Sequence, residues 1–122
     1  MKEENAYDLL HRGRKFLKEG NSAQAAVVLK RAGKIEPEKG SILEALGQAY
    51  YNYKQYYLAK DEFEKAVEID PTNHYAHFGL GLCLNHLGQK VFALKHLKIA
   101  LAMEPDSEDY QKALKKVKGS DE

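Results

Sequence analysis

The sequence contains no tryptophan, one cysteine and three prolines, and it has no apolar run of membrane-spanning length. A lone cysteine excludes an internal disulfide and suits a reducing compartment. A formal net charge of +1 gives no general attraction to nucleic acid or to an anionic membrane surface. The charged first residues show no signal-peptide pattern. We therefore expect a cytoplasmic protein with no nucleic-acid partner and no membrane insertion.

Catalytic signatures are also missing. Gly79 and Gly81 lie in a predicted helix with no strand before them, which does not indicate a phosphate-binding loop. Cys83 falls in the middle of the same helix, and we expect it to be a small buried packing residue. His74 and His77 are one helical turn apart, but two histidines without a neighbouring carboxylate or thiolate make a poor metal site. The sequence predicts no enzyme activity, no cofactor and no metal.

The three prolines, Pro37, Pro71 and Pro105, stand 34 residues apart, and an acidic residue precedes each one. Self-similarity at a fixed period of this length is typical of repeat architectures. We therefore expect one small unit repeated three times. Other positions that keep the 34-residue step are Gly13, Gly47 and Gly81; Ala25, Ala59 and Ala93; and Ala32, Ala66 and Ala100.

Each unit is predicted to contain two helices, because apolar residues recur at three- and four-residue spacing in two runs. The proline ends the second run, since it cannot donate to the helical ladder and disfavours helical geometry in the residue before it. Side-chain acceptors that can cap the next helix are predicted in two stretches around the prolines, Asp70-Pro71-Thr72-Asn73 and Glu104-Pro105-Asp106-Ser107. The predicted runs are 7–17 and 23–35, then 45–53 and 57–69, then 75–84 and 91–103.

Glycine inside the first helix of each unit costs about 1 kcal/mol relative to alanine. Its recurrence suggests a compensating gain, which we expect to be close approach of the second helix. The small residues Ala25, Ala59 and Ala93 are the predicted opposing surface.

The order Leu46-Gly47-x-x-Tyr50, Ala59-x-x-x-Phe63-x-x-Ala66 and Pro71 resembles the tetratricopeptide repeat (TPR) family, and the third unit repeats most of it. The first unit diverges, with Arg12 at the leucine position. The resemblance implies an all-α fold, a right-handed superhelical α-solenoid of three antiparallel helix pairs with a seventh, capping helix. It implies a single domain over 1–122, with repeats at 6–39, 40–73 and 74–107 and a capping helix at 107–118.

In TPR arrays the first helix of each unit lines a concave groove, where a peptide or helical segment of a partner protein binds. The resemblance therefore implies an adaptor or scaffold. Tyr51 and Phe78 are the strongest individual candidates for contact, although such aromatics can instead pack between neighbouring first helices, and both interpretations stay open. The groove residues expected by phase are Tyr7, His11, Arg14, Lys18, Glu44, Gln48, Tyr51, Asn52, Tyr75, Phe78, Leu82, Asn85 and His86.

Some TPR domains hold the C-terminal carboxylate of heat-shock chaperones with a clamp of lysines and asparagines. The matching positions here offer Arg14 as their one charged residue, so the sequence predicts that this chain is not of that subclass. The other matching positions are Leu10, Ala45, Tyr75 and Gly79.

A second functional hypothesis is a structural module that assembles with itself into weak homo-oligomers. The second helix of the second unit is acidic, whereas that of the third unit is basic. Such charge runs are usually solvated faces, but opposite faces could also attract two copies. The sequence identifies neither the partner nor the pathway, and it leaves open whether the chain is part of a longer protein.

Overall fold

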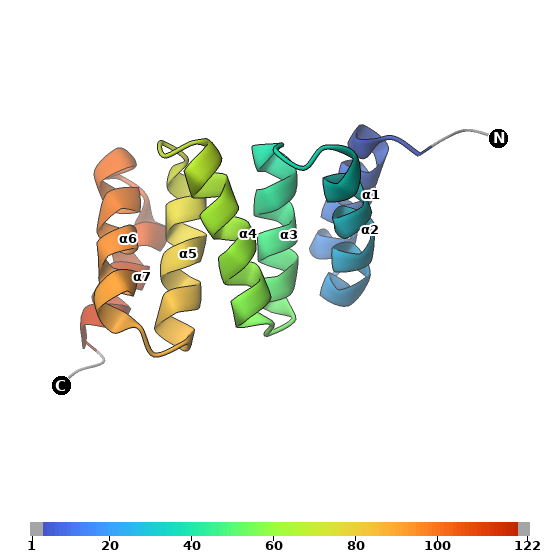
Figure 1. The fold of residues 1–122 in the computed structure, drawn as a ribbon. Coiled ribbons are helices and arrows are strands. Elements are labelled where there is room, and N and C mark those ends of the chain that lie inside the picture. Colours follow the sequence, from blue (N-terminus) through green and yellow to red (C-terminus); the bar gives the residue numbers. More distant parts are fainter. Residues whose placement is uncertain (1–3, 120–122) are drawn as a thin grey trace.

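The structure, a computed structural model, describes residues 4–119, and within that range the chain forms seven α-helices and no strands (Figure 1). This confirms the all-α solenoid expected from the repeats. The helices are α1 (Ala6–Lys18), α2 (Ser22–Ile35), α3 (Gly40–Asn52), α4 (Tyr56–Ile69), α5 (His74–His86), α6 (Lys90–Met103) and α7 (Glu108–Gly119).

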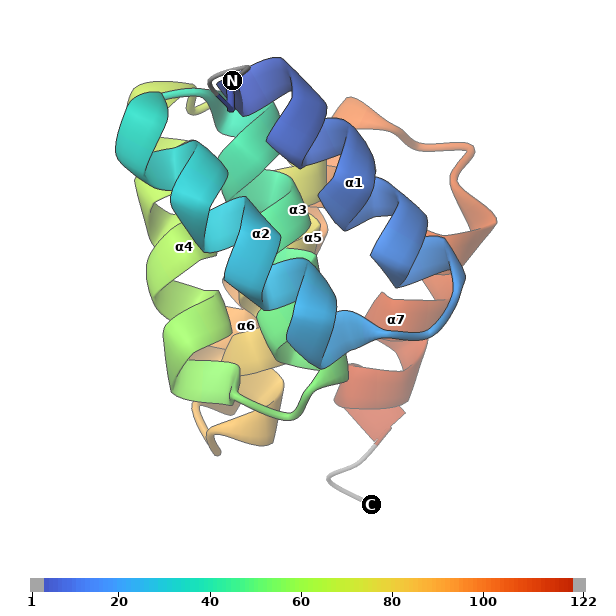
Figure 2. The ribbon, with the colours of Figure 1, turned by 90° about the vertical axis from the view of Figure 1, so that its right-hand side faces the viewer.

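The helices form two layers. In Figure 1 α2, α4 and α6 lie toward the viewer, with α3 and α5 seen between them, and Figure 2 shows α1, α3 and α5 in a second layer. Each helix packs on the next along the chain, and contacts between α1 and α3, α3 and α5, and α5 and α7 hold the second layer together. Because of this arrangement, residues at one phase of the repeat recur on one face of the molecule.

The prolines act as the sequence predicts. The residue before each one leaves helical geometry, with φ of −128° at Glu36, −138° at Asp70 and −130° at Glu104. The helices α2, α4 and α6 therefore end just ahead of a proline in all three units.

Both predicted stretches supply a capping acceptor, and in each it is the last residue. Asn73 Oδ1 accepts a hydrogen bond from the Ala76 N–H at 3.0 Å, and Ser107 Oγ accepts one from the Tyr110 N–H at 3.2 Å. Each bond satisfies a backbone donor that the first helical turn leaves without a partner. Asn5 caps α1 in the same way, a contact that the repeat pattern does not indicate.

The predicted start of α3 is wrong. The helix begins at Gly40, ahead of the expected residue 45. The reason is burial, because Ile42 and Leu43 are 0% and 4% exposed and therefore place the first turn of α3 against the core.

The second helix of each unit approaches the interior glycine closely, as expected, and the nearest atoms belong mainly to a large side chain. A Cβ built at Gly47 would lie 2.8 Å from Phe63 Cζ, and one at Gly81 would lie 2.8 Å from Leu97 Cδ2. Gly13 faces Leu29 in the same way. The large residues Leu29, Phe63 and Leu97 therefore occupy the space that a side chain at these glycines would fill. At Gly81 the backbone of the expected Ala93 is also close, with its carbonyl oxygen at 3.2 Å.

The turn inside each unit uses a left-handed residue. The φ angles are +79° at Gly20 and +78° at Gly88, and the equivalent position of the second unit holds Lys54 at +64°. Glycine adopts this conformation at little cost, whereas lysine does so under strain.

The last helix covers the open end of the array. Tyr110 and Val117 of α7 are 7% and 3% exposed, and α7 packs on α5 and α6. This confirms the capping helix that the sequence predicts.

Candidate functional site

Three helices of the α1–α3–α5 layer contribute side chains to one hollow, which has a volume of about 330 Å³. Arg14 comes from α1, and Tyr75 comes from α5. The remaining side chains come from α3. The lining residues are Arg14, Ser41, Glu44, Ala45, Gln48 and Tyr75. Four predicted groove residues, Arg14, Glu44, Gln48 and Tyr75, are therefore brought together.

Glu44 and Tyr75 give the hollow its acidic and aromatic sides. Glu44 is half-buried, and its Oε2 accepts a hydrogen bond from Asn73 Nδ2 at 3.1 Å. The carboxylate is thereby fixed in one orientation. Burial, and then the nearby negative charge of Glu44, raise the pKa of Tyr75 to about 12. The phenol is therefore a neutral hydrogen-bonding group at any physiological pH.

Tyr51 and His86, both predicted groove residues, contact each other. The distance between Tyr51 Oη and His86 Nε2 is 3.0 Å. The imidazole also stacks on the ring of Tyr56, with centroids 4.1 Å apart and an interplanar angle of 4°. Burial is the main reason that the pKa of Tyr51 is raised. Tyr51 is therefore held by its neighbours at the junction of the second and third units.

Phe78 is half-buried and packs on the capping helix. Its ring lies 4.6 Å from that of Tyr110 and 6.4 Å from that of Tyr75. The hydroxyl of Tyr110 in turn lies 2.7 Å from His74 Nδ1. For both Tyr51 and Phe78, then, part of the ring serves packing between elements and part stays accessible.

The other predicted groove residues do not share this hollow. Tyr7 and His11 are exposed and contact each other edge-to-face at 4.6 Å, and Lys18 is exposed near the end of α1. Asn52 lines a different hollow of about 420 Å³ beside the turn that contains Gly20. The two remaining predicted groove residues, Leu82 and Asn85, are half-buried.

Of the positions that would carry a chaperone-type clamp, Arg14, Ala45 and Tyr75 line the hollow, although little of Ala45 is exposed. Leu10 and Ala45 are each 6% exposed. Gly79 is buried, and a Cβ there would lie 2.5 Å from Phe63 Cζ. This glycine, expected by phase in the groove, instead makes room for the ring of α4.

Two features of the site layer were missed from sequence. Ser41 lies at the same repeat phase as Tyr7 and Tyr75, so the 34-residue step could have found it. The stacking partner Tyr56 is the first residue of α4, a helix of the other layer, and no periodic signal indicated its contact.

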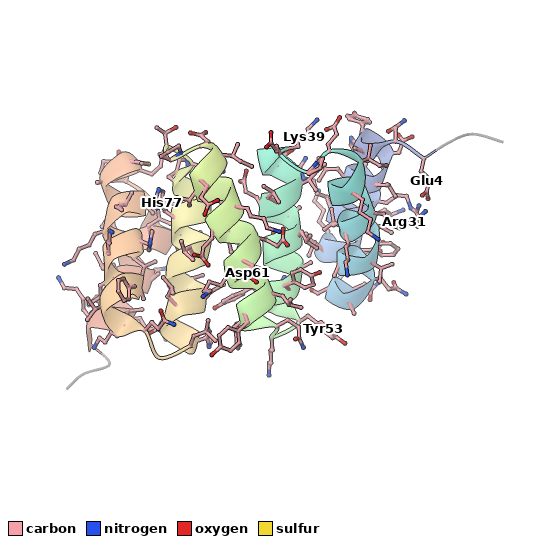
Figure 3. The ribbon with its side chains drawn as sticks, in the orientation of Figure 1. Glu4, Arg31, Lys39, Tyr53, Asp61 and His77 are labelled. Atoms are coloured by element: carbon pink, nitrogen blue, oxygen red, sulfur yellow. The ribbon has the colours of Figure 1, made fainter. Side chains whose placement is uncertain are left out.

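A pair of histidines links α5 to α6. His77, which projects from α5 in Figure 3, is 5% exposed, with Nε2 at 2.8 Å from the Pro71 carbonyl oxygen and Nδ1 at 3.0 Å from Nδ1 of His96. The carbonyl requires a donor, so a neutral His77 carries its proton on Nε2, and Nδ1 of His96 then donates to Nδ1 of His77. Burial, followed by the charges of His77 and Lys95, lowers the pKa of His96 to about 4.

Reactive and metal-binding groups are not assembled in the described range. Cys83 is 0% exposed, and burial raises the pKa of its thiol to about 12, which confirms the predicted packing role. Within residues 4–119 no group of three or more His, Cys, Asp or Glu side chains is placed to hold a metal ion. Over the same range no helix is both long and apolar enough to cross a bilayer.

Sequence comparison finds two overlapping matches to models described as tetratricopeptide repeat, at residues 41–73 and 62–91. The chain is 33% identical to mouse Superkiller complex protein 3 over 106 residues, which is 87% of this chain and 7% of that protein. It is 29% identical over 105 residues to anaphase-promoting complex subunit 3 of Schizosaccharomyces pombe, covering 86% of this chain and 16% of that subunit. The chain thus spans a small part of the length of these curated relatives.

Solved structures share the fold. The first TPR of Spaghetti (RPAP3), bound to the HSP90 peptide SRMEEVD, superposes with a TM-score of 0.89 at 21% identity, covering 94% of this chain and 91% of that one. The TPR domain of Arabidopsis OM64 superposes with a TM-score of 0.88 at 20% identity over 92% and 93% of the two chains. A Thermobaculum terrenum O-GlcNAc transferase mutant gives 0.86 at 25% identity, covering 92% of this chain but 22% of the enzyme.

Proposed function

We propose, from the premise that this chain is a tetratricopeptide-repeat solenoid, that it binds a peptide or helical segment of a partner protein along α1, α3 and α5. In this proposal it is a non-catalytic adaptor or scaffold of the cytoplasm. The supporting observation is the hollow of about 330 Å³ to which all three helices contribute. A segment lying across it would contact three successive units at once.

The side chains around the hollow indicate the chemistry of the bound segment. Arg14 and Gln48 are exposed and can donate hydrogen bonds to peptide carbonyls or to an acidic side chain. Tyr75 presents part of an aromatic ring, a typical interface group. Glu44 faces the same space and disfavours a strongly acidic ligand. We therefore expect an apolar or mildly acidic segment, held by Arg14 at one side and by Tyr75 at the other.

We also propose that the ligand is not a chaperone C-terminal carboxylate. Arg14 is the one charged side chain at the clamp positions, and Leu10, Ala45 and Gly79 are buried. The peptide SRMEEVD, seen bound to the first TPR of Spaghetti, provides the test. We expect no saturable binding of this peptide by fluorescence anisotropy, and binding in the micromolar range would contradict the proposal.

Exposed residues allow a cleaner test of the groove than its half-buried aromatics, whose removal also weakens packing. The variant Arg14→Glu with Gln48→Ala changes two exposed groove residues. The matched control, Lys34→Glu with Gln24→Ala, makes nearly the same chemical changes on α2 of the other layer. We expect both variants to keep the helicity and melting temperature of the wild type.

Affinity capture followed by mass spectrometry then compares the three proteins. Partners held by the groove are captured by the wild type and the control but not by the groove variant. If the groove variant captures the same proteins at the same level, the α1–α3–α5 layer is not the binding surface.

A further inference from the structure

The layer of α2, α4 and α6 faces away from the proposed groove, and all three of its helices carry exposed apolar side chains. On α2 these are Val27 and Ile35, which are 61% and 50% exposed. Tyr57 at the start of α4 is 66% exposed, and at the start of α6 Val91 is 78% and Phe92 56% exposed. At the opposite ends of these helices Ile69 and Met103 are 45% and 37% exposed. Apolar groups gathered on one face commonly mark an interface.

Between their apolar ends, α4 and α6 carry charges of opposite sign. The exposed middle of α4 carries Asp61 and Glu64 beside one lysine, Lys65, and that of α6 carries Lys95 and Lys98. Figure 3 shows Asp61 on α4, in the layer that also holds α6. Within residues 4–119 Asp61, Lys95 and Lys98 form no ion pair, while Glu64 pairs with Lys60 of its own helix at 3.7 Å.

The complementary groups share repeat phases. Asp61 and Lys95 are 34 residues apart, as are Glu64 and Lys98, so each pair occupies equivalent positions on α4 and α6, the second helices of consecutive units. The apolar groups follow the same rule. Their phase pairs are Tyr57 with Val91, Leu58 with Phe92, and Ile69 with Met103.

We propose that two copies of this chain associate face to face through α4 and α6, about a two-fold axis that runs along these helices, lies outside the molecule and is centred over the face between them. Such a rotation exchanges the two helices without changing height along them. It therefore places α4 of each copy on α6 of the other. Asp61 then faces Lys95 of the second copy, Leu58 faces its Phe92, and every contact occurs twice.

The neighbouring pair of helices does not offer the same match. The exposed surface of α2 is also basic, with Lys30 and Lys34. An axis between α2 and α4 would place Lys30 opposite Glu64 and Lys34 opposite Glu68 of the second copy, but it would also place Arg31 opposite Lys65. That last contact brings like charges together. The axis between α4 and α6 places Lys65 opposite Ile99 and Glu68 opposite Ala102, and it brings no like charges together.

The size of the surface sets the strength of the dimer. Helices α4 and α6 have 14 residues each, so each is about 21 Å long and about 10 Å wide. Together they offer roughly 400 Å² per copy, about half of a standard interface. We expect a reversible dimer with a dissociation constant of about 10 µM to 1 mM that weakens as salt is added. The α1–α3–α5 layer stays open in it, so this association adds to the proposed groove function.

Charge inversion tests the pairing without touching the core. One variant carries Asp61→Lys and Glu64→Lys, which makes both helices basic, and the other carries Lys95→Glu and Lys98→Glu, which makes both acidic. In sedimentation equilibrium, each alone is expected to dimerise at least about tenfold more weakly than the wild type. An equimolar mixture of the two is expected to form a heterodimer, because basic α4 then meets acidic α6 and basic α6 meets acidic α4.

The matched control carries Lys30→Glu and Lys34→Glu on α2, the same charge change as in the α6 variant. We expect its dimerisation to equal that of the wild type, and circular dichroism to show the same helicity for all four proteins. Three results would overturn the proposal: a wild type that stays monomeric up to about 1 mM, charge-inverted variants that show no heterodimer when mixed, or a control that loses the dimer as the α6 variant does.

Discussion

The three units meet at two junctions, which differ in the size of the side chain at one repeat position. The junction of the first and second units has Leu29 there, and the junction of the second and third has Phe63. In the first junction, formed by Leu29, Gly13 and Ala45, a leucine of α2 packs over the glycine of α1. Leu29 and Ala45 belong to one buried cluster, with exposures of 0% and 6%. Leucine is small enough that the second unit can have alanine, Ala45, at the position that faces it.

In the second junction, formed by Phe63, Gly47 and Gly79, a larger ring takes the place of leucine. A Cβ built at Gly47 would lie 2.8 Å from Phe63 Cζ, and one at Gly79 would lie 2.5 Å from it. The residue that gives way is in the following unit, because Gly79 occupies the phase of Ala45. Repeats in this chain are thus adjusted to their neighbours and are not interchangeable copies.

The largest effect is expected from Gly79→Ala. Three atoms of the Phe63 ring would lie within 2.5–2.7 Å of the new methyl group, and a ring cannot move out of the way as the end of a flexible chain can. Overpacking costs up to about 3 kcal/mol, and the better helix propensity of alanine offsets about 1 kcal/mol. We expect the free energy of unfolding to fall by about 2 kcal/mol, measured by urea denaturation.

The double variant Gly79→Ala with Phe63→Leu gives the second junction the same residues, leucine and alanine, that the first junction has at these positions. It is expected to be more stable than Gly79→Ala alone, because leucine leaves space for the methyl group. If the two changes instead add their separate losses, the ring of Phe63 is not the reason for glycine at this position.

The converse change, Ala45→Gly, is expected to cost about 1.5 kcal/mol in the first junction. The loss combines about 1 kcal/mol of helix propensity with the removal of a buried methyl group. The same urea measurement applies. Adding Leu29→Phe, which introduces the ring found at the second junction, should recover part of the lost stability. A further drop in stability would show that the two junctions differ in more than side-chain volume.

A pH effect of about 1 kcal/mol is expected from the third unit and not from the first, which holds Leu9 and Val28 at the phases of His77 and His96. The pKa of His96 is lowered from 6.5 to about 4, so the unfolded chain binds this proton at higher pH than the folded one. Stability is therefore full above pH 6.5, falls as the pH drops toward 4, and then levels off. The size is discounted because His96 is partly exposed.

The measurement is the free energy of unfolding at a series of pH values between 7 and 4. His96→Gln should flatten the curve in this window, since glutamine does not titrate. His11→Gln, a change at an exposed histidine of α1, should leave the slope of the wild type. An unchanged slope in the His96 variant would assign the pH dependence to other groups.

The smallest effect, and the one stabilising change, is expected from Lys54→Gly. Lys54 has φ +64° at the turn position where the first and third units use glycine. Relief of that strain should raise the free energy of unfolding by about 0.5–1 kcal/mol. The mirror change Gly20→Ala, at φ +79°, should lower it, and a stabilised Gly20→Ala variant would contradict this account.

Much of the fold could be predicted because the repeat reports backbone positions. Proline at a fixed step marks where each second helix ends, and the apolar residues Tyr110 and Val117 identify the capping helix. The period does not indicate how far each side chain extends, and therefore it does not predict which side chains contact each other. The sequence therefore suggested alanines opposite the interior glycines, whereas longer residues such as Phe63 extend from the next turn to fill the space.

The candidate site shows the same limit. Phase places Arg14, Glu44 and Gln48 in one layer, but it does not reveal that they share a hollow. The exposure of Phe78 depends on Tyr110 of α7, which lies outside the repeat, and so it could not be inferred from periodicity. Whether the predicted groove residues contact a partner stays a prediction.

The ring of Phe63 belongs by sequence to the second repeat, yet it fills space in both the second and the third. A fragment ending at residue 73 would keep Gly47 but lose Gly79 and leave one face of the ring in water. The unit that was duplicated in this chain is therefore not the unit that folds. The smallest stable piece around Phe63 must run from α3 through α5, so a recombined array would have to exchange Phe63 and Gly79 together.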